Sequence, residues 1–261
     1  MKKIGIMCAA LLLPLCAFGE SLTGYDISKR AHDVESGKTA QYNAVLTLQT
    51  KKGAVRTREI TLRRKQYDGV KKSLITFSAP KDVAGVAYLS FEYDSNTDAA
   101  KESESWLYMP AMKKVRRISG SSRQDDFMGS DFTYEDIGDR GLDKDDFTLA
   151  GEETVEGSDC WKVDCVAKDK SEKTPRRIVW IRKDNYLIQK VHLYNQRGEV
   201  ERELICSDIK EVDGIWTICK MFMKNLQTEH TSTLELKTLN FNIDLSDNLF
   251  TVASIERGLT R

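Results

Sequence analysis

Apolar and polar residues alternate with a period of two along most of the chain. Tyr42, Ala44, Leu46 and Leu48, for example, alternate with mostly polar neighbours up to a turn at residues 51–53. Successive side chains of a strand point to opposite faces of a sheet, so this alternation predicts half-buried strands. Comparable segments, separated by turn residues, recur as far as residue 242. We therefore expect a mainly β (α+β) fold with about eleven strands, as in an all-β sandwich or barrel.

Two segments depart from this alternation. Residues 23–37 predict a helix, because Thr23 can form a capping box with Asp26 and Gly37 is a natural stop. Between residues 119 and 140 the alternation fails, which indicates a loop or short helices inserted between strands. No linker rich in Pro, Ser or Gly divides the chain, so residues 20–261 are expected to form a single domain.

The N-terminal segment has the pattern of a cleavable signal peptide. Lys2 and Lys3 precede an apolar run over residues 4–18, and the small residues Ala17 and Gly19 precede the expected cut. The run is shorter than the ~20 apolar residues that a membrane span needs. We expect residues 1–19 to be removed and the mature protein to be periplasmic.

Two other interpretations of this segment remain open. It can be retained as an N-terminal anchor helix. It can also belong to a lipoprotein acylated at Cys16, although the bulky Leu15 stands where such signals have a small residue.

The charge balance excludes one class of partner. The chain has 40 Lys and Arg against 40 Asp and Glu, and loss of Lys2 and Lys3 leaves 38 basic residues in the mature protein. A dedicated nucleic-acid binder needs a basic excess to neutralise phosphates, so we expect no nucleic-acid partner. An apolar fraction of 40% with no net charge also argues against a disordered chain.

No catalytic or metal-binding motif stands out. The histidines at positions 32, 192 and 230 share no spacing, and the sequence has no Gly-x-Ser-x-Gly, phosphate-binding loop or His-Glu-x-x-His. The acidic stretch over residues 138–146 lacks the Gly and Glu of an EF-hand, so we interpret it as a solvated acidic loop. The sequence predicts a protein that is not an enzyme and holds no metal or cofactor.

Four cysteines follow the signal segment. Cys160 and Cys165 lie on one predicted strand, about 16 Å apart and on opposite faces, whereas a disulfide needs Cα atoms within about 7 Å. Cys206 and Cys219 flank a predicted hairpin turn at residues 212–214, so a bridge between its strands is one interpretation. Free buried thiols are the other.

Several predicted strands are apolar on both faces. Residues 106–109, 178–181 and 215–223 combine tryptophan with aliphatic neighbours. Either a helix covers the second face as ordinary core, or the sheet encloses an apolar ligand cavity, which is a common use of the interior of a small barrel.

A central motif connects the sequence with a known family. It consists of residues 106–110 (WLYMP), 114–118 (KVRRI), 126–132 (DFMGSDF) and 134–137 (YEDI). With the helix after the signal, the strand RIVWI at 177–181 and the segment LSDNLF at 245–250, this motif resembles the outer membrane lipoprotein-sorting protein family, the relatives of LolA and LolB. The resemblance covers nearly the whole mature chain.

The resemblance implies an unclosed antiparallel β-barrel of about eleven strands, with an N-terminal helix and a helical or loop lid across its mouth. It also implies a periplasmic carrier that binds acyl chains of lipoproteins or other lipids and escorts them between membranes. Inner-membrane export machinery and an outer-membrane acceptor are candidate partners. The single Arg that ties lid to barrel in LolA has no matched position in this sequence.

Candidate site residues follow from this interpretation. We expect the hydrophobic lining to be drawn from Leu89, Phe91, Trp106, Tyr108, Trp180 and Trp216, each with ordinary core as the alternative. Phe127, Met128 and Phe132 lie in the non-strand segment and are candidates for the lid. Arg116 and Arg117 can meet a lipid head group, or at least one of them can form an internal ion pair.

The sequence therefore predicts a carrier of lipidated or otherwise apolar cargo. The alternative is a non-enzymatic interaction module, such as an accessory subunit of a membrane export complex or a surface adhesin. In that case the barrel would be filled by its own side chains.

Overall fold

The computed structural model describes residues 22–93, 101–138 and 140–258, so the signal-peptide prediction lies outside the described residues. Within them, thirteen strands form one sheet, slightly more than the expected number of about eleven. The strands are β1 (Thr39–Gln49), β2 (Val55–Tyr67), β3 (Val70–Ala79), β4 (Ala87–Tyr93), β5 (Glu104–Met109), β6 (Lys114–Ile118), β7 (Asp145–Val155), β8 (Ser158–Ala167), β9 (Arg176–Arg182), β10 (Ile188–Tyr194), β11 (Val200–Val212), β12 (Ile215–Asn225) and β13 (Thr231–Phe241).

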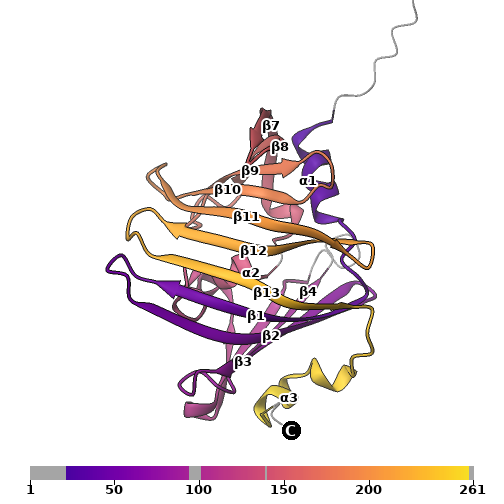
Figure 1. Ribbon diagram of the computed structural model, residues 1–261, viewed down its shortest axis with the longest axis vertical. Coiled ribbons are helices and arrows are strands. Elements are labelled where there is room, and N and C mark those ends of the chain that lie inside the picture. Colours follow the sequence, from indigo (N-terminus) through magenta and orange to yellow (C-terminus); the bar gives the residue numbers. More distant parts are fainter. Residues whose placement is uncertain (1–21, 94–100, 139, 259–261) are drawn as a thin grey trace, which may run out of the picture.

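The sheet is antiparallel throughout and open. Its order is β6-β5-β4-β3-β2-β1-β13-β12-β11-β10-β9-β8-β7, so β6 and β7 are its edges. Every neighbouring pair consists of strands that are consecutive in sequence, except β1 and β13. These two strands lie far apart in sequence and pair with Leu46 opposite Leu234. The sheet curls, and Figure 1 shows α2 and β4 behind the strands that face the viewer. The expected mainly β, unclosed architecture is confirmed.

The first helix begins where the sequence predicts and ends early. Helix α1 (Gly24–His32) has the full capping box between Thr23 and Asp26, but it stops at His32 instead of continuing to Gly37. Gly37 serves the chain differently: its φ of +78° turns the chain into β1, close to Phe241. None of the described helices is long and apolar enough to cross a membrane.

The inner face of the curled sheet carries the largest apolar core. Alternate residues of β1 to β5 and of β10, β12 and β13 meet there, including Leu46, Phe77, Tyr88, Leu107 and Met223. Helix α1 packs on the same face near the β7 edge, where Ile27 contacts Val163 and Ile181. The alternation thus buries one side of each strand, as expected for a sheet with one principal core.

The C-terminal segment covers part of the outer face. Its elements η5 (Asp247–Leu249) and α3 (Val252–Glu256) follow β13. Phe250 and Ile255 are fully buried against Leu74 and Leu89 on β3 and β4. Asp247 fixes the segment to β2 by accepting from Lys65 Nζ at 2.7 Å and from the Tyr67 hydroxyl at 2.7 Å.

Candidate functional site

The non-strand segment between β6 and β7, residues 119–138, is called the insertion below. It contains η2 (Gly120–Gln124), η3 (Phe127–Gly129) and α2 (Tyr134–Ile137). Because β6 and β7 are opposite edges of the sheet, the connection between them has to pass from one edge to the other, and its residues Phe127, Phe132 and Tyr134 place it on the inner face. Figure 1 shows α2 on that side of the sheet.

Aromatic side chains of the insertion pack into the inner-face core. Phe127 is 1% exposed, and its ring centre lies 5.6 Å from that of Tyr88 and 5.4 Å from that of Tyr134. Phe132 is 3% exposed, and Met128 is partly buried against the same cluster. The three residues predicted for the lid therefore lie in a covering segment, where they act as core side chains.

Arg202 on β11 binds the insertion to the sheet. Its side chain is 8% exposed, and its guanidinium donates to the Asp131 carbonyl at 2.8 Å and to the Asp136 carboxylate. A planar guanidinium suits this double role, because its fixed donors can satisfy a carbonyl and a carboxylate together. Arg58 on β2 donates in the same way to the Met128 carbonyl.

Asp131 forms a second polar anchor. Its carboxylate contacts His230 Nδ1 at 2.6 Å and accepts from Ser232 Oγ at 2.6 Å, while its backbone N–H donates to Ser232 Oγ at 2.9 Å. In a nucleophile–base–acid triad the His would lie between the Ser and the Asp. Here Asp131 lies between them and Ser232 is fully buried, so the arrangement fixes the insertion and does not activate the hydroxyl.

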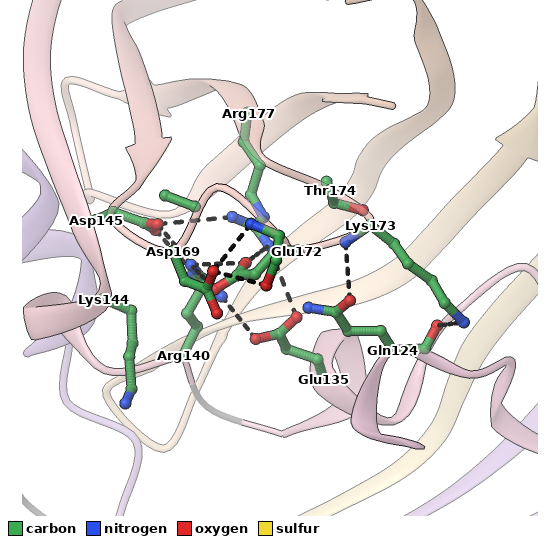
Figure 2. Close-up of polar contacts among 12 residues, drawn as sticks. Gln124, Glu135, Arg140, Lys144, Asp145, Asp169, Glu172, Lys173, Thr174 and Arg177 are labelled. Atoms are coloured by element: carbon green, nitrogen blue, oxygen red, sulfur yellow. Dashed lines mark hydrogen bonds and ion pairs between the residues drawn. The ribbon is translucent and has the colours of Figure 1, made fainter. Parts of the chain in front are cut away.

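A buried charge cluster fixes the C-terminal end of the insertion (Figure 2). Arg140 binds Glu135 on α2 at 2.6 Å, Asp145 at the start of β7 at 2.6 Å and Glu172 at 3.0 Å. Arg177 on β9 lies 3.8 Å from the same three carboxylates. Burial alone would lower the pKa of Arg140, but hydrogen bonds to Asp145 and Glu172 outweigh it and raise that pKa above its ordinary value.

This cluster corrects one interpretation of the sequence. The acidic stretch over residues 138–146 was expected to be a solvated loop. Asp143 and Asp146 are exposed, as expected, whereas Asp145 is 6% exposed and bound to Arg140. Asp139 of that stretch lies outside the described residues. The arginine neutralises a carboxylate that could not be buried alone.

Sequence reasoning missed the three sheet arginines, although a signal for them exists. Each arginine lies on the inner face, and the next two inner-face positions of its strand, two and four residues later, are apolar. These rows are Arg58, Ile60 and Leu62; Arg177, Val179 and Ile181; and Arg202, Leu204 and Cys206. A cationic side chain on an otherwise apolar face needs a buried hydrogen-bond acceptor, because an unpaired buried charge is strongly unfavourable. The pattern shows the need for a partner but cannot identify it.

Part of the inner face remains incompletely covered. Leu62, Leu204, Met221, Leu236 and Ile188 contact the core cluster but keep intermediate exposure. We call these five residues the inner strip. Two surface depressions, of about 610 and 380 Å³, lie elsewhere, at Lys38 and Lys65 and at Ser158 and Lys183. The strip is an apolar surface beside the insertion and belongs to neither depression.

The residues predicted to line a cavity do not form one lining. Leu89, Phe91, Trp106 and Tyr108 lie on the outer face of β4 and β5, beneath the C-terminal segment. They face outward because successive side chains of a strand point to opposite faces of the sheet. The segment after β13 covers these outward-facing side chains. In this structure they are packed against the chain itself, which was the alternative given for each of them.

The two other tryptophans lie apart from that group. Trp180 packs with Cys160 and Ile178, and its indole N–H donates to Glu153 at 3.0 Å. Trp216 is 40% exposed near the start of β12. Neither belongs to the inner-face core cluster, so the expectation of one shared aromatic lining is corrected.

The paired arginines of the central motif lie on β6. Arg117 is exposed and pairs with Glu104 on the neighbouring strand at 3.0 Å, and Arg116 is exposed as well. The nearby acidic residues of the insertion, Asp131 and Asp136, bind His230 and Arg202. One of the two arginines, Arg117, therefore forms an ion pair, but this pair lies on the surface and not in the interior as expected.

All four described cysteines are free and buried. Cys206 lies opposite Met221, two positions from Cys219 along β12, so the two thiols are diagonal neighbours and form no bridge. Burial raises the pKa of Cys165 and of Cys206 to about 12. Of the two interpretations, free buried thiols describe this structure.

Comparisons with known proteins agree with this architecture. A family model described as "Uncharacterized protein" matches residues 69–257. A DUF1329 family protein from Desulfovibrio piger is 32% identical, with a TM-score of 0.82 over 89% of this chain and 97% of that chain. A putative outer membrane lipoprotein-sorting protein domain from Vibrio parahaemolyticus is 28% identical, with a TM-score of 0.82 over 90% and 98%.

A more distant structure extends the likeness. A LolA superfamily protein from Nitrosomonas europaea is 17% identical, with a TM-score of 0.68 over 89% of this chain and 99% of that chain. At this identity the likeness concerns the fold. No protein of curated function matches the sequence. The chain belongs to the DUF1329 family and has the LolA-like, lipoprotein-sorting fold.

Proposed function

We propose that the protein is a periplasmic carrier that binds lipoprotein acyl chains or other lipids on the inner face of its sheet and escorts them between membranes. The observation that carries this proposal is the inner strip, an apolar surface left partly exposed beside an insertion that polar contacts hold in place. The lipoprotein-sorting fold supports it. Such a carrier has no catalytic group, and its cargo comes from one membrane and passes to an acceptor at another.

The energetics of acyl-chain binding suit an apolar strip. Each buried methylene stabilises the complex by about 0.8 kcal/mol, so a long chain gains affinity from shape-tolerant side chains such as Met221. Phe127, Phe132 and Tyr134 occupy the neighbouring part of the inner face. In the proposed cycle the insertion moves away as cargo enters, and the apolar face it leaves extends the strip.

The test measures binding of a fluorescent fatty acid together with mass spectrometry of organic extracts of the native protein. The double variant Leu204→Gln, Met221→Gln places two amides on the inner strip and should weaken binding at least tenfold. Its matched control, Ile205→Gln, Phe222→Gln, alters the adjacent residues of the same strands, which face outward with similar burial. The control should bind as the unaltered protein does.

One observation favours a second candidate, the non-enzymatic interaction module. The insertion fills part of the inner face with the chain's own side chains, as a binding module without cargo would. The same experiment separates the two. Absence of co-purifying lipid together with no saturable uptake rejects the carrier and leaves the interaction module.

A further inference from the structure

Four turns of neighbouring hairpins lie at the same end of the sheet. They are the turns β12–β13, β1–β2, β3–β4 and β5–β6. Together with the first residues of β2 and β6 they comprise residues 226–230, 50–56, 80–85 and 110–114, which we call the turn surface. The Lys51–Glu229 ion pair, at 2.8 Å, joins the first two. Gly85 lies against Pro110 and joins the last two, since a Cβ there would be 3.1 Å from Pro110 Cγ. Figure 1 shows the β1–β2 and β12–β13 hairpins projecting on the same side of the molecule.

Exposed apolar side chains concentrate on the turn surface. Val55 is 55% exposed, Met112 52% and Leu226 39%. Only six large apolar side chains among the described residues are at least 36% exposed, and the other three are dispersed: Tyr25 on α1, Leu149 on β7 and Trp216 on β12. Half of the strongly exposed apolar residues thus lie in or directly beside these neighbouring turns.

The turn surface is also basic, in a chain whose charges balance. It carries six cations and two carboxylates: Lys51, Lys52, Arg56, Lys81, Lys113 and Lys114 against Asp82 and Glu229. No ion pair within the described ranges occupies Lys52, Lys113 or Lys114, whereas Glu229 is already bound by Lys51. Because the excess is local, the net charge of the chain does not reveal it.

This combination fits a lipid surface better than a protein partner. A protein interface buries a contiguous apolar centre, whereas Val55, Met112 and Leu226 stand on three separate turns. A bilayer interface accepts separate apolar tips, while lysines remain at the level of anionic head groups. We propose that the turn surface docks the protein on an anionic phospholipid bilayer.

The docked orientation has a consequence for the insertion. Arg58 and His230, which hold Met128 and Asp131 of the insertion, lie in or next to the same turns. Docking therefore places the bilayer beside the anchors that fix the insertion. The proposal itself goes beyond carrier activity, because docking needs no cargo and is measured on cargo-free protein.

The experiment is co-sedimentation of the mature protein with phosphatidylcholine vesicles that contain or lack phosphatidylglycerol. We expect binding only with phosphatidylglycerol, weakened by salt. The triple variant Val55→Ser, Met112→Ser, Leu226→Ser should abolish it. Lys113→Gln, Lys114→Gln should weaken it at least tenfold, given the usual contribution of each lysine near an anionic surface.

Each variant has a matched control elsewhere on the molecule. Tyr25→Ser, Leu149→Ser, Trp216→Ser removes the three other exposed apolar side chains, and Lys210→Gln, Lys237→Gln removes two other exposed lysines. Both controls should bind as the unaltered protein does, and thermal unfolding should show that all variants are folded. An equal loss of vesicle binding in variants and controls overturns the proposal. Absence of binding to phosphatidylglycerol vesicles also overturns it and would favour an acidic protein partner.

A fluorescent label tests the orientation. The four described cysteines are buried, so in the protein without residues 1–19 an environment-sensitive thiol label reports on Met112→Cys or on Trp216→Cys when either is introduced. On adding phosphatidylglycerol vesicles, the label at position 112 should shift to the blue and the label at 216 should not. The reverse result, or equal shifts, contradicts docking through the turn surface.

Discussion

Arg202 and Arg117 show how strongly the contribution of an arginine to stability depends on its burial. Arg202 is buried and binds two groups of the insertion, whereas Arg117 is exposed and binds one carboxylate. Removing one partner of a buried ion pair leaves an uncompensated charge, while an exposed pair in water gains little.

We therefore expect Arg202→Ala to lower the free energy of unfolding by roughly 3 kcal/mol, since Asp136 and the Asp131 carbonyl lose their donor. The control Arg117→Ala should cost less than about 1 kcal/mol. Urea denaturation measures both. Similar losses for the two variants would show that Arg202 does not anchor the insertion.

The buried thiols predict a pH dependence of stability. Burial raises the pKa of Cys165 and Cys206 to about 12, whereas a thiol in the unfolded chain has a pKa of about 8.5. The unfolded state therefore loses these protons first, so the stability they contribute is complete below about pH 8.5 and is lost as the pH rises toward 12.

Denaturation from about pH 8 to 11 should show this decline, and Cys206→Ala should make it shallower. The alanine variant loses some packing at every pH, so the slope and not the absolute value is the measurement. An unchanged slope would mean that the thiol is not protected in the folded protein.

At the scale of elements, two covering segments pack on opposite faces of one sheet. The insertion places Phe127 in the inner-face core, and the C-terminal segment places Phe250 in the outer-face cluster. Both side chains are at most 1% exposed, so their removal should leave comparable cavities.

Phe127→Ala and Phe250→Ala should each lower the free energy of unfolding by about 3–5 kcal/mol. Their effects on a fluorescent fatty acid should differ. If the inner face binds cargo, Phe127→Ala weakens the cover and increases uptake, whereas Phe250→Ala leaves uptake unchanged in the folded protein. Equal uptake by both variants, measured below their unfolding transitions, would contradict an inner-face site.

The whole sheet depends on the pairing of β1 with β13. This pair joins the β2–β6 half to the β7–β12 half, and it brings the N-terminal strand against the last one. Long-range pairing in the centre of a sheet couples both halves, because neither buries its central strand alone. We accordingly expect one cooperative unfolding transition.

Trp106 on β5 and Trp161 on β8 report on the two halves. In variants that retain one of these tryptophans and replace the others by phenylalanine, fluorescence should give the same urea midpoint as circular dichroism. Separate midpoints would divide the chain into two domains and contradict the single-domain prediction.

Local signals predicted much of the fold because they act over a few residues. The alternation of Tyr42 to Leu48 matches the burial along β1, and the Thr23–Asp26 capping box begins α1. The motif around Phe127 and Phe132 indicated a covering segment, which the insertion provides. The early end of α1 at His32 was missed, because Gly37 serves the entry into β1 instead.

Local patterns of residues suffice to predict the strands, their two faces and the family, because period-two alternation, caps and motifs each extend over only a few residues. They cannot tell which apolar face would be covered by which segment. Leu89 and Trp106 are equally apolar beneath a lid or beneath the C-terminal segment, and only the path of the chain after β13 decides between them. The arginine anchors, the inner strip and the turn surface join residues far apart in sequence, so only the tertiary structure brings them together.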